Sequence, residues 1–133
     1  MELITYWLDY YEKTLNDELD DDVLQELKKN IIDTLCGPLT VFDLPYAKNL
    51  YTFAKDFQRE EGAIIWGSEI KTDIVTAVYV NCSLSRFRDL VNTYIAKRCG
   101  GHTSDNISVA LTLGQYFQSR AEDVLRAVYT ADL

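Results

Sequence analysis

The single histidine of this chain, His102, lies in a segment whose residue types suit proton-transfer chemistry, NTYIAKRCGGHTSDN, residues 92–106. Histidine titrates near neutral pH and can both accept and donate a proton, so it serves as a general acid or base. Gly100 and Gly101 precede it and allow the backbone to approach a ligand closely or to adopt a positive φ. The Ser104-Asp105-Asn106 run that follows is typical of the start of a helix, where free backbone N–H groups favour an anion.

Basic residues gather on the N-terminal side of this histidine. Four of the 13 basic residues fall between positions 86 and 98: Arg86, Arg88, Lys97 and Arg98. In a chain whose net charge is −8, this local reversal indicates an anionic small molecule, such as a carboxylic acid. Each feature also has a structural explanation. The histidine can be a turn or capping residue, the basic residues can form the solvated face of a helix, and Ser104-Asp105-Asn106 can be a plain helix cap. The residue pattern alone favours these structural explanations over a catalytic site.

The composition limits the classes of protein to which the chain can belong. Its 133 residues suit one domain, residues 1–133, and its 47% hydrophobic content supports a folded core. The net charge of −8 argues against nucleic acid, which needs a basic surface, and no apolar run reaches the roughly 20 residues that span a bilayer. The first residues, MELITYWLDYYEK, lack the features of a signal peptide, so we expect a cytoplasmic protein.

Neither a disulfide framework nor a metal site is expected. The three cysteines, Cys36, Cys82 and Cys99, are odd in number and form no Cys-x-x-Cys motif. The carboxylate run Asp20–Asp22 directly precedes an amphipathic segment. We therefore interpret it as a helix N-terminus, which favours acidic residues, rather than as a metal site.

Apolar residues recur at helical spacing along most of the chain, which predicts an all-α protein, a helical bundle of about six helices. The expected helices cover residues 2–15, 23–36, 45–59, 72–89, about 105–113 and 119–133; residues 90–103 are expected to form a loop, and AIIW, residues 63–66, stays unassigned. We expect Gly37 and Pro38 to end the second helix. Ser104 or Asp105 is expected to cap the fifth, and Ser119 with Glu122 to form a capping box at the last.

The segment around His102 also resembles the signature of the MmgE/PrpD family, which includes 2-methylcitrate dehydratase. Residues 86–107, RFRDLVNTYIAKRCGGHTSDNI, match a family pattern close to RFLDFNDTYLAKGGTCHPSDNI. Three further segments resemble family segments in the same order: IIDTLCGPL, residues 31–39, AIIWGSEIKT, residues 63–72, and AVYVN, residues 77–81. The ordered set covers nearly the whole chain, which is more specific than any single match.

The resemblance implies a mostly helical domain and cofactor-independent chemistry on carboxylic acids, as in propionate catabolism. Family members dehydrate 2-methylcitrate or citrate, decarboxylate cis-aconitate, or epimerise related acids. Asp89, Thr93 and His102 fall on the family's active-site Asp, Thr and His, so the resemblance assigns them the catalytic roles. Lys97 and Arg86, which could pair with substrate carboxylates, and Ser104 are the implied substrate-binding residues.

The chain also departs from the family pattern, with Arg88, Val91-Asn92 and Thr103 at positions where the family differs. Family enzymes are considerably longer, and their second domain and later active-site residues have no counterpart here. Because the helical pattern still runs at residue 133, we expect a truncated domain; a frayed terminal helix is the alternative.

Three interpretations follow. The first is a lyase domain for a di- or tricarboxylic acid, inactive alone and completed by a homodimer or a partner chain. The second is a non-catalytic helical oligomerisation or interaction module derived from the family. The third is an unrelated helical bundle with chance similarity.

Overall fold

The computed structural model describes residues 3–15, 18–95 and 100–132, and within them it confirms the predicted all-α bundle. Six helices and two small antiparallel hairpins make up the described chain. The helices are α1 Leu3–Leu15, α2 Asp21–Leu39, α3 Pro45–Lys55, α4 Ile74–Arg86, α5 Thr103–Tyr116 and α6 Ala121–Asp132. The strands are β1 Gln58–Ile64 and β2 Lys71–Thr72, which pair, and β3 Tyr94–Ile95 and β4 Gly100–Gly101, which pair. None of the described helices is both long and apolar enough to cross a membrane.

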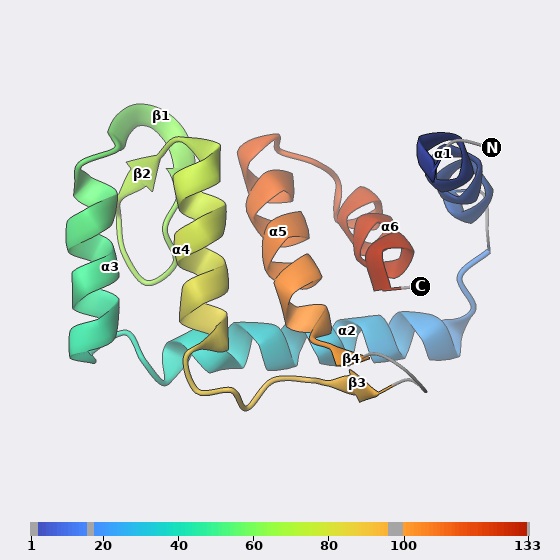
Figure 1. The fold of residues 1–133 in the computed structure, drawn as a ribbon, viewed down its shortest axis with the longest axis horizontal. Helices are drawn as coiled ribbons and strands as arrows, with labels where there is room; N and C mark the ends of the chain where they lie inside the picture. Colours follow the sequence, from blue (N-terminus) through green and yellow to red (C-terminus); the bar gives the residue numbers. More distant parts are fainter. Residues whose placement is uncertain (1–2, 16–17, 96–99, 133) are drawn as a thin grey trace.

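Helices α4 and α5 form the centre of the fold and pack side by side (Figure 1). On one side, α3 and the β1–β2 hairpin cover α4, and on the other side α6 packs against α5. Helix α2 runs across the ends of α4 and α5 and also contacts α6. Helix α1 lies beyond α6, at the end of the molecule farthest from α3 (Figure 1).

Two apolar clusters fill the described part of the chain. The larger one joins α3, α4 and the first hairpin; it contains Val41, Ala47, Leu50, Ala54, Ala63, Ile65, Ala77, Val80 and Leu84. The smaller one joins α2, α5 and α6 through the buried side chains of Leu27, Ile107 and Val128. Helix α1 adds no side chain to either cluster.

The predicted end of the second helix at Gly37 and Pro38 is wrong, because α2 continues to Leu39. Proline lacks an N–H, so Pro38 gives up one helical hydrogen bond, and only Leu39 follows it in the helix. Gly37 has a packing role instead. A Cβ there would lie 3.0 Å from the Ser85 carbonyl oxygen, so glycine lets α2 approach α4 closely.

Other helix boundaries also differ from the predicted ones. Helix α3 ends at Lys55 rather than at residue 59, because the chain turns there into β1. The unassigned AIIW segment begins inside β1, which pairs with β2. The capping box at Ser119 is also wrong: α6 begins at Ala121, and the side-chain pair at its start joins Arg120 to Asp123. The predicted cap at Asp20 is confirmed, since its carboxylate accepts a hydrogen bond from the N–H of Val23.

Buried polar side chains line the interface between α4 and α5. The amide of Asn81, which is fully buried, donates to the Ile64 carbonyl at 3.0 Å and to Thr112 Oγ1 at 3.1 Å. Its Oδ1 accepts from the N–H of Trp66 at 2.9 Å. One turn along, Ser108 donates to Ser85 Oγ at 3.0 Å. These bonds fix how far one helix can slide along the other.

We expect Asn81→Ala to destabilise the fold strongly, because it leaves a buried N–H, a carbonyl and a hydroxyl without their partner. Each unsatisfied group costs about 1–3 kcal/mol, so a total loss of about 3 kcal/mol is expected. Urea unfolding measures this loss. The matched control is Ser83→Ala on the same helix. The Ser83 hydroxyl donates to the Tyr79 carbonyl on the exposed side of α4, so its loss leaves no buried group without a partner. A loss below about 1 kcal/mol for Asn81→Ala would show that the amide does not hold the interface.

Asp73 caps α4, and its contribution should depend on pH. Its side chain accepts bonds from the Thr76 hydroxyl and from the N–H groups of Val75 and Thr76. These bonds lower the pKa of Asp73 below its ordinary value of 3.8, and the bond from the Thr76 hydroxyl has the largest effect.

Because the folded-state pKa is the lower one, the stabilisation is complete above the ordinary value and is lost as the pH falls through the folded value. We expect Asp73→Ala to cost about 1 kcal/mol at pH 7 and progressively less in acid. Urea midpoints measured from pH 7 to pH 2 test this. A difference from the unmutated chain that stays constant with pH would contradict it.

Candidate active site at the start of helix α5

The β3–β4 hairpin brings Thr93 and His102 together. Tyr94 pairs with Gly101 in an antiparallel register, so Thr93 and His102 are the next residues to face one another. The distance from Thr93 Oγ1 to His102 Nδ1 is 3.1 Å. A Cβ on Gly101 would lie 2.6 Å from the Tyr94 ring, so a larger residue there would displace this half-exposed side chain. The predicted loop at residues 90–103 therefore contains a short hairpin that positions the histidine.

Thr93 contacts the Val91 carbonyl as well as the imidazole, and both contacts bear on the tautomer of His102. The distance from Thr93 Oγ1 to the Val91 carbonyl oxygen is 3.3 Å. We infer that the hydroxyl donates to this carbonyl, so that its oxygen accepts from Nδ1–H of His102. In this tautomer Nε2 of the neutral imidazole is unprotonated and can accept a proton from a ligand. Nε2 lies 4.0 Å from Asp89 Oδ1.

Asp89 and Asp105 lie on either side of Arg86. The Arg86 Nη2 is 3.5 Å from Asp89 Oδ1, and its Nε is 3.5 Å from Asp105 Oδ1. Asp89 follows the end of α4 with a positive φ of 51°, which is uncommon for a residue other than glycine. The backbone is thus held in an unfavoured conformation at a residue that faces His102 and Arg86. Such strain is found at functional sites more often than elsewhere.

Helix α2 supports this loop through two polar side chains that the sequence interpretation missed. Asp33 Oδ2 accepts a hydrogen bond from the N–H of Asn92 at 3.1 Å. The Asn92 side chain also donates to Asn30 Oδ1. Asn92 directly precedes Thr93, so α2 holds the segment that carries the histidine's partner. The signal was present as two polar residues, Asn30 and Asp33, between the apolar residues of the second predicted helix.

The remaining predicted site residues are placed differently. Ser104 is fully buried, and its hydroxyl has no partner among the described residues. The predicted cap at Ser104 or Asp105 is wrong, because α5 begins at Thr103 and His102 takes the N-cap position without a side-chain capping bond. Lys97 lies outside the described residues. The site therefore brings together four of the six predicted residues: Arg86, Asp89, Thr93 and His102.

The cluster is open to solvent rather than enclosed. The side chain of Asp89 is 74% exposed and that of His102 is 25% exposed. Apolar side chains stand exposed beside it, with Leu90 80% and Ile95 89% accessible.

Among the described residues no group of three histidine, cysteine or carboxylate side chains could hold a metal ion. Cys82, whose sulfur lies 3.8 Å from the Asp105 carbonyl oxygen, has a pKa raised by burial and then by the Asp105 charge. Its thiol therefore stays protonated at neutral pH. The cluster offers acid–base chemistry: an imidazole in contact with Thr93, a carboxylate 4.0 Å from it, and a guanidinium.

The family can be decided by comparison with known proteins. The model of the MmgE/PrpD N-terminal domain matches residues 8–131, nearly the whole chain. The chain belongs to the MmgE/PrpD family. This excludes the interpretation of a chance similarity in an unrelated bundle. No curated protein and no solved structure matched the chain.

The tautomer of His102 can be tested directly, because the chain has one histidine and its imidazole signals are unambiguous. We expect ¹⁵N NMR at pH 8 to show a protonated Nδ1 and an unprotonated Nε2. Thr93→Val removes the acceptor oxygen and should produce a mixture of tautomers, whereas Thr93→Ser should keep the Nδ1–H form. A protonated Nε2 in the unmutated chain would contradict the assignment.

Proposed function

We propose that this chain supplies the Asp–Thr–His part of a carbon–oxygen lyase site of the 2-methylcitrate dehydratase type, acting on a di- or tricarboxylic acid. The observation that carries the proposal is the pair of contacts around His102. Thr93 Oγ1 lies 3.1 Å from Nδ1, and Asp89 Oδ1 lies 4.0 Å from Nε2. With Nδ1 in contact with Thr93, Nε2 is the ring nitrogen that we propose accepts or donates the proton.

The chemistry follows from that nitrogen. Dehydration of a hydroxy acid breaks one C–H bond and one C–O bond on neighbouring carbons and releases water. His102 Nε2 takes the proton from carbon, or in the protonated form it gives a proton to the departing hydroxyl. In either case an imidazolium occurs on the reaction path, and the Asp89 carboxylate stabilises its charge. The membership in the family agrees with this activity but does not select the substrate.

Arg86 is the proposed carboxylate-binding residue. Its guanidinium already contacts Asp89 and Asp105 at 3.5 Å, which is longer than a good charge-assisted hydrogen bond. A substrate carboxylate can therefore compete for it with better geometry. Lys97 and Ser104 are proposed as further substrate contacts on the family resemblance alone.

We also propose that another surface covers the site during catalysis. Proton transfer from carbon needs several groups to converge on the substrate and needs water to be excluded. Here Asp89 is largely exposed, and the apolar side chains of Leu90 and Ile95 stand bare next to it. A second copy of the chain or a partner polypeptide would bury them, and we expect residues 1–133 alone to be inactive. If the chain is instead a non-catalytic interaction module, these apolar residues still bind a partner and His102 has no role.

Titration calorimetry with citrate separates these two functions. We expect heat of binding from the unmutated chain, and affinity at least tenfold weaker for Arg86→Ala, because a charge-assisted contact is worth about 1.5–3 kcal/mol. Arg120→Ala is the matched control, since Arg120 pairs with Asp123 on the exposed start of α6. Absence of heat from the unmutated chain would overturn the carboxylate-binding proposal and leave the interaction module.

Turnover is measured on 2-methylcitrate and on citrate by the absorbance of the unsaturated acid, with His102→Ala as the control. We expect no turnover from the chain alone. Turnover that His102→Ala abolishes would show that the chain assembles the site by itself, which contradicts the need for a covering surface. Turnover that survives His102→Ala would remove the histidine from the mechanism.

A further inference from the structure

The net charge of the chain is concentrated at one end of the sequence. Residues 1–26 contain nine acidic residues and a single basic one, Lys13. The other 107 residues contain twelve acidic and twelve basic residues, so their side chains carry no net charge. The whole formal charge of −8 therefore belongs to residues 1–26, which include α1 and the start of α2.

The same end of the molecule exposes a series of large apolar side chains. Within the described residues of α1 only Thr14 is buried. Seven large apolar side chains on this helix are 37–71% exposed: Leu3, Ile4, Tyr6, Trp7, Leu8, Tyr11 and Leu15. The helix is attached to α6 by a few polar contacts, such as the bond from Arg126 Nη1 to the Leu15 carbonyl at 2.8 Å. An apolar surface of this kind on a charged helix is typical of a binding site.

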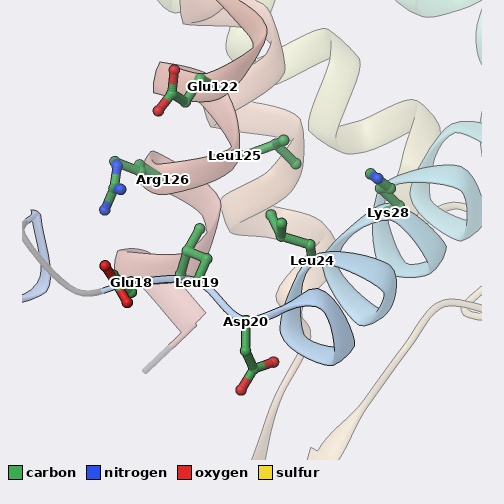
Figure 2. A pocket seen from close by; sticks show the side chains of 8 residues that line it. All are labelled: Glu18, Leu19, Asp20, Leu24, Lys28, Glu122, Leu125 and Arg126. Atoms are coloured by element: carbon green, nitrogen blue, oxygen red, sulfur yellow. The ribbon is translucent and has the colours of Figure 1, made fainter.

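A cavity of about 710 Å³ continues this surface between α2 and α6. Figure 2 shows that Leu19, Leu24 and Leu125 border it from three segments, with the charged groups of Glu18, Glu122 and Arg126 around them. A smaller cavity of about 270 Å³ between α1 and α6 shares Arg126 and adds Tyr11 and Leu15. The two cavities join α1 to α2 across α6.

We infer that this acidic, leucine-lined surface, formed by α1, residues 18–28 and residues 121–127, docks a basic amphipathic helical segment of a partner protein. A helix that carries leucines on one face and lysines or arginines on the other fills the cavity and neutralises the acidic border. Glu18, Asp20 and Glu122 line the cavity together with the basic residues Lys28 and Arg126. Seven more acidic residues lie in positions 1–26, against Lys13 alone. The site is separate from the His102 cluster, so it does not depend on the proposed lyase activity.

Charge argues against the other occupants. Anionic lipid and nucleic acid are repelled by an acidic surface. In a symmetric dimer the same patch would face itself and place like charges together. The rest of a second copy carries no net charge, so its overall charge does not attract it to this surface.

Fluorescence anisotropy tests the inference with a labelled helical peptide of leucine and lysine at amphipathic spacing. The controls are a scrambled peptide of the same composition and a leucine–glutamate peptide of the same pattern. We expect only the patterned basic peptide to bind, with a Kd that rises with salt concentration. The emission of Trp7 should shift to the blue as the peptide covers it.

Matched charge variants localise the binding. Glu18→Lys with Glu122→Lys should weaken binding at least tenfold, whereas Glu60→Lys with Glu61→Lys, exposed on β1 at the opposite end, should change it less than twofold. Trp7→Ala should weaken binding without affecting the fold, because this side chain is exposed; Phe53→Ala on α3 is its control.

No binding of the patterned peptide, equal binding of the scrambled peptide, or equal loss in both charge variants would overturn the inference. A dimer in light scattering that dissociates on Trp7→Ala and excludes the peptide would also overturn it, in favour of a second copy.

Discussion

The fold depends on the buried polar contacts between α4 and α5. An apolar helix interface tolerates small slides of one helix along the other, but a buried amide does not, because each displaced bond leaves a group unsatisfied. Asn81 binds the first hairpin and α5 at once, and Ser85 repeats the contact to α5 one turn later. The register of the two central helices is thus set by hydrogen bonds, while the apolar clusters on either side supply most of the stability.

This register determines the geometry of the site. The partners are four residues apart on both helices, Asn81 and Ser85 on α4 and Thr112 and Ser108 on α5, so the next step on α5 is Ser104. Helix α4 ends at Arg86, which leaves no helical position opposite Ser104 and explains why its buried hydroxyl has no partner among the described residues. The same ending releases Arg86 to reach Asp105 at the start of α5.

Much of the fold followed from the sequence, because helical spacing and caps such as Asp20 are local signals. The errors arise where a residue serves a distant contact. Gly37 reads as a helix stop, yet its role is set by Ser85, 48 positions away in the chain. The strands that align Thr93 with His102 are two residues long, too short to show a period. The prediction of a role for His102 came from the ordered resemblance to a family. The contacts of Asn30 and Asp33 with Asn92 depend on the position of α2, which the sequence does not show.

The position of Arg86 suggests how substrate binding and proton transfer are linked in the proposed lyase. In the free chain Arg86 and His102 share one oxygen of Asp89 as a neighbour, at 3.5 and 4.0 Å. A substrate carboxylate bound to the guanidinium would replace Asp89 as its partner. Asp89 Oδ1 would then face Nε2 of the imidazole, the nitrogen proposed to move the substrate proton. In the proposed lyase, carboxylate binding and proton transfer would therefore meet at one oxygen of Asp89.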